Sequence, residues 1–144
     1  MTALNLKNVC KSFGSVEVLK DIDLTVEDGE FVVFVGPSGC GKTTIMRMIA
    51  GFLEPSSGDI QIKGNSVLNV PPNKRHVNMV FQHLALFPMM NIADNIGYGL
   101  RRAGMHKKDI GFKVDEALER IGQPGIGHRR VDELSGGQKK RIAI

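Results

Sequence analysis

The sequence predicts an α/β fold, with an antiparallel β part at the start, then a buried strand, a glycine-rich loop and a helix, and finally a mostly helical part. Three observations support this order. Apolar and polar residues alternate over residues 4–26, an unbroken apolar run at residues 31–35 leads into clustered glycines, and helix-type spacing of apolar residues follows residue 91. With 144 residues, 42% of them hydrophobic, the chain is expected to form one domain or a piece of a larger one.

The β part is expected to supply most of the strands. The alternation over residues 4–26 predicts two half-buried antiparallel strands with a turn at residues 12–15. Residues 31–35, Phe-Val-Val-Phe-Val, do not alternate, which is typical of a strand covered on both faces. Two further short strands are expected at residues 58–64, which end in a Gly-Asn turn, and at residues 77–81.

Helices are predicted on both sides of residue 84. The apolar spacing of residues 43–50 fits a helix that ends at Gly51. Asn91 and Asp94 resemble a helix-capping pair that opens a helix to about residue 100. Residues 107–121 place their apolar side chains on one helical face, so a second helix of a helical subdomain is expected there.

Composition excludes several classes of protein. No apolar run approaches the roughly 20 residues of a membrane helix, and no secretory signal precedes the first strand. The two cysteines are too few for a disulfide framework, so a cytoplasmic protein is expected. The net charge of +4 includes basic groups at residues 107–108, 129–130 and 139–141. No aromatic residues interleave them, so a solvated surface is favoured and no nucleic-acid partner is expected.

A glycine-rich phosphate loop is predicted at residues 36–43, Gly-Pro-Ser-Gly-Cys-Gly-Lys-Thr, which match the P-loop pattern (the glycine loop below). Its glycines let backbone N–H groups approach a polyphosphate, and the positive end of the following helix points at the same place. Lys42 is the expected catalytic residue at the β- and γ-phosphates, the Thr43 hydroxyl is expected to ligate Mg²⁺, and Cys40 is interpreted as a spacer. The predicted nucleotide-binding residues are Gly36, Pro37, Ser38, Gly39, Cys40, Gly41, Lys42, Thr43 and Thr44.

A second glycine motif, Leu-Ser-Gly-Gly-Gln, occupies residues 134–138 (the LSGGQ segment below). Ser135 and Gln138 have the spacing of a capping box, so the segment can be interpreted simply as a helix start. Two glycines in a first helical turn cost about 1 kcal/mol each relative to alanine, however, and residues 139–141 add positive charge near the positive end of that helix. We therefore expect an anion such as a phosphate to approach Gly136 and Gly137.

Together the two motifs resemble the nucleotide-binding subunit of ABC transporters, over nearly the whole chain. The sequences around the glycine loop and the Met-Val-Phe-Gln of residues 79–82 are similar to the carbohydrate-importer branch, with polyamine, iron and sulfate importers as close neighbours. The resemblance implies a P-loop NTPase core over residues 1–83, a helical subdomain over residues 84–133, and the LSGGQ segment with the start of its helix over residues 134–144. ATP and Mg²⁺ are the implied cofactors.

The resemblance also assigns roles to single residues. Phe13 would stack on adenine, and the alternative is that its ring only packs in a turn. Gln82 would be a catalytic residue that senses Mg²⁺ and the γ-phosphate, and the alternative is that it is only a polar residue at a strand end. Ser135, Gly136, Gly137 and Gln138 would contact ATP held by the glycine loop of a second copy, in a head-to-tail dimer. Residues 83–100 would face transmembrane permease subunits at the inner face of the plasma membrane, with core packing as the alternative.

The chain departs from the family pattern in two ways. Leu84, Met89 and Val131 replace residues that are usual in this branch, which bears on the choice of permease. The family also continues past the LSGGQ segment with an aspartate, a glutamate and a histidine of the catalytic site, and Asp132 and Glu133 precede that segment and so cannot replace them. Little ATPase activity, and exposed apolar surface at residues 31–35, are therefore expected of residues 1–144 alone.

Three other interpretations remain open at this stage. A soluble ABC ATPase that acts on ribosomes or DNA would be favoured by two such motifs in tandem or a basic linker, and the sequence contains neither. An unrelated P-loop kinase or GTPase would not carry the LSGGQ segment. A non-catalytic remnant of a longer gene is compatible with descent from an importer ATPase.

Overall fold

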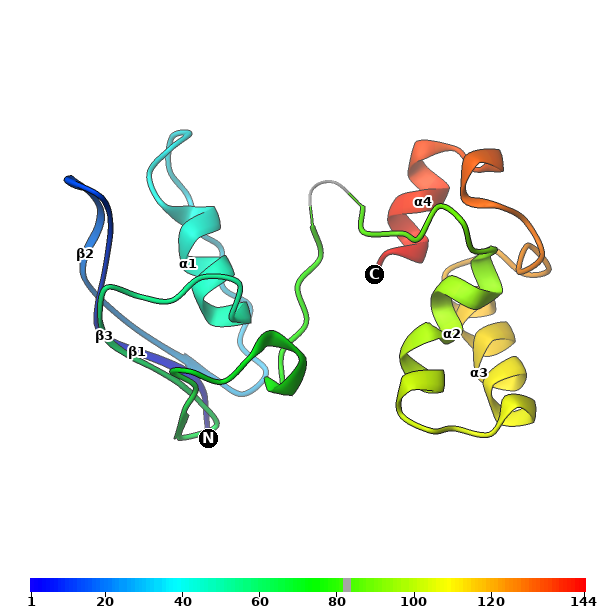
Figure 1. Ribbon diagram of the computed structural model, residues 1–144, viewed down its shortest axis with the longest axis horizontal. Helices are drawn as coiled ribbons and strands as arrows, with labels where there is room; N and C mark the ends of the chain where they lie inside the picture. Colours follow the sequence, from blue (N-terminus) through cyan, green and yellow to red (C-terminus); the bar gives the residue numbers. More distant parts are fainter. Residues whose placement is uncertain (82–83) are drawn as a thin grey trace. The chain divides into compact units, whose positions relative to one another are not determined.

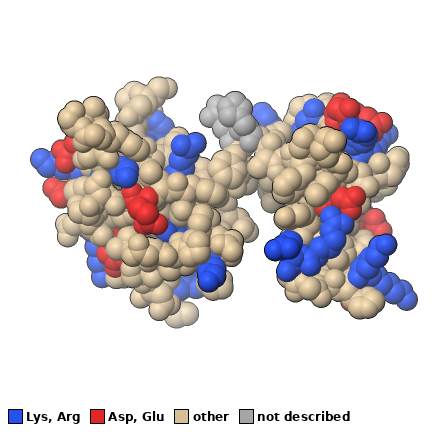
Figure 2. Space-filling view, in the orientation of Figure 1, with Lys and Arg blue, Asp and Glu red and all other residues tan. Residues whose placement is uncertain are grey.

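The computed structural model describes residues 1–81 and 84–144 and divides into two compact units, Met1–Met79 and Val80–Ile144 (Figure 1). The first unit combines a sheet with one α-helix, and the second is built from short helices. On the face drawn in Figure 2, basic and acidic side chains are interspersed on each unit. None of the helices in the described ranges is both long and apolar enough to cross a membrane.

The first unit contains a four-stranded antiparallel sheet of order β2-β1-β3-β4. Its strands are β1 (Thr2–Phe13), β2 (Val16–Glu27), β3 (Ser57–Ile62) and β4 (Asn65–Ser66). The predicted strands of residues 4–26 and the turn between them are confirmed, because Phe13 pairs with Val16 across a tight connection. The predicted strand at residues 58–64 is confirmed as β3, which turns at Lys63 and Gly64 into β4.

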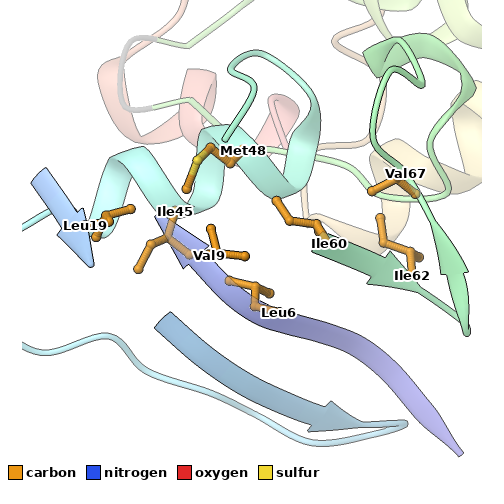
Figure 3. Packing of buried hydrophobic residues seen from close by; sticks show 8 residues of the cluster. All are labelled: Leu6, Val9, Leu19, Ile45, Met48, Ile60, Ile62 and Val67. Carbon is orange, nitrogen blue, oxygen red and sulfur yellow. The ribbon is translucent and has the colours of Figure 1, made fainter. Parts of the chain in front are cut away.

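The core of this unit lies between the sheet and α1 (Lys42–Ala50). Figure 3 shows Ile45 and Met48 of α1 directed toward apolar side chains of the sheet, among them Val9 and Ile60. Met48, Val9 and Ile60 are completely buried, and each such side chain contributes roughly 1.5–3 kcal/mol to folding. The buried residues of the cluster are Leu6, Val9, Leu19, Ile45, Met48, Ile60, Ile62 and Val67. This packing fixes the helix that follows the glycine loop.

Two strand predictions are wrong. Residues 31–35 and 77–81 belong to no strand, and Phe31 and Val35 are each 90% exposed. A strand requires a hydrogen-bonded neighbour, and within the described residues none pairs with either segment. Most of the apolar run at residues 31–35 is therefore exposed, as the sequence predicted, while Phe34 is partly buried and packs against the core of the first unit.

The second unit contains α2 (Ile92–Arg102), α3 (Lys107–Arg120) and α4 (Gly136–Ile142), with a 3₁₀ turn, η2, at Val131–Glu133. The helices predicted from residue 91 and over residues 107–121 are confirmed. Another 3₁₀ turn, η1 (Pro72–Lys74), belongs to the first unit. The core of the second unit consists of Ile92, Ile110, Val114, Leu118 and Leu134. Leu134 thereby anchors the LSGGQ segment in this core.

Candidate functional site: two glycine-rich helix starts

The glycine loop leads directly into α1 and leaves the first backbone N–H groups of that helix open. Gly41 is the N-cap residue, with φ of 92°, and no side chain in the described residues caps the helix. The first N–H groups of a helix lack partners within the helix, and the described residues offer no other acceptor to Lys42, Thr43 or Thr44. These amides lie at the positive end of the helix dipole, so the loop is suited to bind an anion.

Glycine is required at position 41 of this loop, and a side chain at position 36 would displace that of Cys40. A methyl group added at Gly41 would lie 2.5 Å from Leu19 Cδ2, and a positive φ already strains any other residue there. A methyl group added at Gly36 would lie 2.7 Å from Cys40 Sγ. Leu19 of strand β2 therefore packs against the loop at Gly41 and restricts its backbone conformation there.

Lys42 bends back over the loop. Its Nζ donates to the carbonyl oxygens of Gly36 and Pro37, at 2.7 and 2.6 Å, and lies 3.3 Å from Cys40 Sγ. An ammonium group has three donors and sulfur is a weak acceptor, so the third donor is held only loosely. The positive charge is thus fixed beside the open amides, with one donor free to be exchanged for a better acceptor.

The opposite end of α1 is held by Arg75, whose side chain is 1% exposed. Its Nη1 donates to the carbonyl oxygens of Met48 and Ile49, at 2.7 and 3.1 Å, where a helix leaves carbonyls unsatisfied. Its Nε donates to the Val70 carbonyl oxygen at 2.7 Å, and Nη2 lies 3.3 Å from Glu54 Oε1. Burial lowers the pKa of the guanidinium group, and the Glu54 carboxylate partly opposes that shift.

Arg75 was not identified from the sequence. Its helix partners lie 26 and 27 residues away along the chain, so no local pattern indicates them. A methyl group added at Gly51 would lie 2.6 Å from Arg75 Nε, so the predicted helix end is also the place where this side chain enters. Both ends of α1 are therefore fixed by contacts that lie outside the helix itself.

The other predicted nucleotide-binding residues of the first unit are dispersed. Phe13, at the end of β1, is 49% exposed, and the Lys11 ammonium lies 5.1 Å from its ring centroid. Its β2 partner, Val16, lies three residues before Leu19, which contacts Gly41, so one hairpin carries both Phe13 and the support of the glycine loop. Ser38, Gly39, Cys40 and Thr43 are exposed.

The predicted magnesium ligands are only partly described. The Thr43 side chain is exposed in the first turn of α1, whereas Gln82 lies outside the described residues. Within the described ranges, no group of three or more His, Cys, Asp or Glu side chains could hold a metal ion. The Thr43 hydroxyl alone would leave most of the octahedral shell of Mg²⁺ to phosphate oxygens and water.

The LSGGQ segment starts a helix in a different manner. Ser135 Oγ accepts from the Gln138 N–H at 3.3 Å, and Gln138 Oε1 accepts from the Ser135 N–H at 2.9 Å. The predicted capping box is thus confirmed. Gly136 and Gly137 have no positive φ, and a methyl group added at either would meet nothing within 4 Å. The local structure therefore does not require glycine at these two positions.

A buried glutamine supports this helix from the side. Gln123, which is 5% exposed, donates from Nε2 to the Gln138 carbonyl oxygen at 3.3 Å. Its Oε1 has no hydrogen-bond partner among the described residues. The sequence offered no signal for this role, because Gln123 stands in a loop of polar and glycine residues after α3. Lys139, Lys140 and Arg141 form no ion pairs within the described ranges, so their charges are not neutralised there.

A glycine loop that opens into a helix, together with a second glycine motif in a helical unit, defines a class of nucleotide-binding protein. The family model described as ABC transporter matches residues 19–144. The chain therefore belongs to the ABC transporter family, and the resemblance inferred from the two motifs is confirmed. The fold prediction, an ABC ATPase cassette with an N-terminal antiparallel sheet, is confirmed as well.

One curated protein and two solved structures show which members of the family the chain resembles. The chain is 49% identical over 138 residues to the Fe(3+) ions import ATP-binding protein FbpC 1 of Rhizobium meliloti (strain 1021), covering 96% of this chain and 39% of that protein. The dimeric structure of MJ0796, a bacterial ABC transporter cassette, matches with a TM-score of 0.87 at 26% identity, covering 98% of this chain and 67% of that one. A post-hydrolysis state of the same cassette, bound to ADP and Pi, matches at 0.85 and 27%, covering 97% and 66%.

These comparisons correct one expectation. The sequence motifs favoured the carbohydrate-importer branch, with polyamine, iron and sulfate importers as close neighbours. The curated relative is named for Fe(3+) import, so the findings support the iron alternative better than sugar transport. The chain spans about two fifths of that relative's length and about two thirds of the solved cassettes.

Proposed function

We propose that this chain forms the ATP-binding part of an ABC importer ATPase and that the glycine loop is its triphosphate site. The observation that carries the proposal is the start of α1, where Lys42 stands beside amide groups for which the described residues offer no acceptor. A polyphosphate supplies the acceptors that these groups lack. The family membership makes ATP the nucleotide of choice.

The proposed binding mode uses the contacts already present in the loop. A phosphate oxygen takes the third donor of Lys42, now 3.3 Å from the Cys40 sulfur, while the bonds to Gly36 and Pro37 keep the ammonium in place. The Thr43 hydroxyl would hold the Mg²⁺ that accompanies the nucleotide, with Gln82 as the second proposed protein ligand. Phe13, half exposed, offers its ring to adenine.

We propose that the LSGGQ segment acts on ATP bound to a second copy, in a head-to-tail dimer. Its glycines leave an open approach to the backbone that the fold does not use, and the uncompensated charges of residues 139–141 favour an anion. Dimerisation of the related MJ0796 cassette supports this arrangement. One nucleotide would then need the glycine loop of one copy and the LSGGQ segment of the other.

Complementation between two defective copies tests the head-to-tail arrangement. Lys42→Ala disables the glycine loop and Ser135→Arg obstructs the LSGGQ segment, so neither variant alone can form a complete site. A mixture of the two can form one complete site per dimer. Sedimentation of a protein that includes this chain, with Mg²⁺ and a non-hydrolysable ATP analogue, should give dimers for the wild type and for the mixture only. Dimers of the wild type without dimers of the mixture would refute the arrangement.

The proposed solute is ferric iron, by analogy with the Fe(3+) import relative, and sugar is the alternative that the comparisons support less well. The proposed partner is a pair of permease subunits at the inner face of the plasma membrane. Exposed apolar side chains of the second unit support this surface, because Phe87 is 42%, Met89 is 88% and Tyr98 is 37% exposed. Uptake of ferric iron in cells that lack the gene for this protein, compared with cells that carry it, tests the solute.

A further inference from the structure

The turn at residues 87–90 is fastened to α2 by one side chain, that of Asn95. Asn95 Oδ1 accepts from the Phe87 N–H at 2.7 Å, and Nδ2 donates back to the Phe87 carbonyl oxygen at 3.1 Å. The same Nδ2 lies 3.3 Å from the Met90 carbonyl oxygen and 2.9 Å from that of Asn91. A single amide group thus holds both backbone groups of the first residue of the turn and also its end.

These contacts define the orientation of the Asn95 amide. Its oxygen faces an N–H group and its nitrogen faces three carbonyl oxygens, so the flipped amide would place like against like at every contact. The turn is closed further by the Met90 N–H, which donates to the Phe87 carbonyl oxygen at 3.2 Å. The Phe87 ring lies 4.8 Å from that of Tyr98 on α2. The exposed apolar side chains of the turn are therefore presented on a fixed backbone.

The start of α2 is joined, in turn, to the segment that precedes the LSGGQ segment. The Ile92 N–H donates to the Arg129 carbonyl oxygen at 2.9 Å, and the Ala93 N–H donates to the Gly127 carbonyl oxygen at 2.8 Å. The first amides of a helix lack partners within the helix, so the chain at residues 127–129 supplies the acceptors that α2 needs. Movement of this end of α2 must therefore move residues 127–129 or break these bonds.

The connection continues to Ser135 without leaving the second unit. Asn91 forms a β-bridge with Arg130, whose N–H donates to Glu133 Oε2 in the turn η2. Leu134 follows and packs in the same core as Ile92. Each step from Asn95 to Ser135 is a hydrogen bond, a covalent neighbour or a buried apolar contact.

We propose that Asn95 is a positioning residue that joins the 87–90 turn and the support of the LSGGQ segment into one cooperative unit. The functional role of this linkage rests on the proposed function, in which the turn would contact a permease subunit and Ser135 would contact ATP bound to a second copy. The linkage itself lies within residues 87–135 and can be tested without either partner. Removal of the Asn95 amide should let the turn and the chain before Ser135 open more often.

Site-resolved amide hydrogen exchange on a protein that contains the whole chain tests the linkage. In Asn95→Ala, exchange should accelerate about tenfold at Phe87, at Ala93 and at Ser135, because all three amides open with the unit. Acceleration at Phe87 alone, with Ala93 and Ser135 unchanged, would overturn the proposal. Equal acceleration throughout the protein would also overturn it, because Asn95 would then only add to global stability.

Asn91→Ala is the matched control. It removes the side-chain cap that accepts from the Asp94 N–H at 2.7 Å, and leaves the bonds of the Asn95 side chain to backbone groups in place. Exchange should accelerate at Asp94 while Phe87 remains protected. If Asn91→Ala exposes Phe87 as much as Asn95→Ala does, the fastening role of Asn95 is refuted.

A second variant keeps the test decisive if Asn95→Ala does not fold. Asn95→Asp retains an oxygen for the Phe87 N–H and loses the donors to the carbonyl oxygens of Phe87, Met90 and Asn91. Phe87, Ala93 and Ser135 should all exchange faster in this variant, because the three amides open as one unit. Unchanged exchange at Ala93 and Ser135 would contradict the linkage. Failure of ATP binding would instead concern the proposed function, because these measurements contain no nucleotide.

Discussion

The two glycine-rich helix starts of this protein look alike in sequence and differ in structure. Among the described residues, no side chain caps α1 at Gly41 and its first amides stay open, whereas α4 begins at Ser135 with a closed capping box. The glycine at position 41 has a left-handed backbone and no room for a methyl group, and those at positions 136 and 137 have ordinary φ values and open space. Only the first set of glycines is required by the fold.

This difference separates two reasons for a glycine. In the glycine loop, the backbone path at Gly41 itself requires glycine, and the described residues leave the first amides of the helix open to an anion. In the LSGGQ segment, the protein satisfies its own Ser135 and Gln138 amides, and the local structure leaves open space at the two glycines, which is the space that the proposed nucleotide contact would use. The proposed function therefore treats the first motif as a triphosphate site within one copy and the second as a surface that meets a nucleotide held by another copy.

The largest effect is expected from Gly41→Ala. The added methyl would overlap with Leu19 Cδ2 at 2.5 Å on a backbone with φ of 92°. Left-handed backbone strain costs about 1–2 kcal/mol and overpacking about 1–3 kcal/mol, so the free energy of unfolding should fall by about 2–5 kcal/mol. Urea denaturation measures it. Gly39→Ala is the control, because φ is 86° there but nothing lies within 4 Å of an added methyl group. Its smaller loss of unfolding free energy measures the backbone strain without the overpacking.

Lys42→Ala should weaken nucleotide binding more than stability. The ammonium contributes a charge-assisted bond to the phosphates, so MgATP affinity should fall about 10- to 100-fold. Isothermal titration calorimetry measures the dissociation constant, and Lys63→Ala is the control because Lys63 lies at the turn between β3 and β4, away from the loop. Equal affinities of wild type and Lys42→Ala would contradict the assignment of the glycine loop as the triphosphate site.

Ser135→Ala tests whether the second helix start is capped by its own side chains. The variant loses the acceptor for the Gln138 N–H, and loss of an N-cap typically costs about 1 kcal/mol. Thermal unfolding followed by circular dichroism measures the change. Thr43→Ala, in the first turn of α1, should leave the stability nearly unchanged, because no side-chain cap is present there among the described residues. A loss of stability as large as that of Ser135→Ala would show that the two helix starts do not differ in their side-chain capping.

The sequence predicted those parts of the fold that depend on near neighbours. The turn end of the β1–β2 hairpin, the end of α1 at Gly51, the Asn91 cap and the Ser135 box all rest on contacts within a few residues, and the rest of the hairpin extends from its turn. The strands expected at residues 31–35 and 77–81 depend on distant neighbours, and the described residues do not supply them.

The same limit applies to the candidate site. The P-loop pattern indicated the glycines and Lys42, but not that the ammonium is bound to the loop's own carbonyl oxygens. Arg75 holds α1 through partners 26 and 27 residues away, and Gln123 reaches Gln138 across 15 residues. Side chains that act at a distance along the chain leave no local pattern, so only the folded structure reveals them.

Gly137→Ala gives the smallest effect on stability and the sharpest test of the comparison. Glycine is a poor helix residue, and the added methyl meets nothing within 4 Å, so the free energy of unfolding should rise by about 0.5–1 kcal/mol. If a nucleotide on a second copy approaches this backbone, the same variant should weaken dimerisation with Mg²⁺ and a non-hydrolysable ATP analogue, measured by sedimentation. Lys140→Ala, within α4 but past its first turn, is the control for helix effects. A more stable protein that dimerises as well as the wild type would mean that nothing binds close to Gly137, and the second helix start would then be only a capped helix.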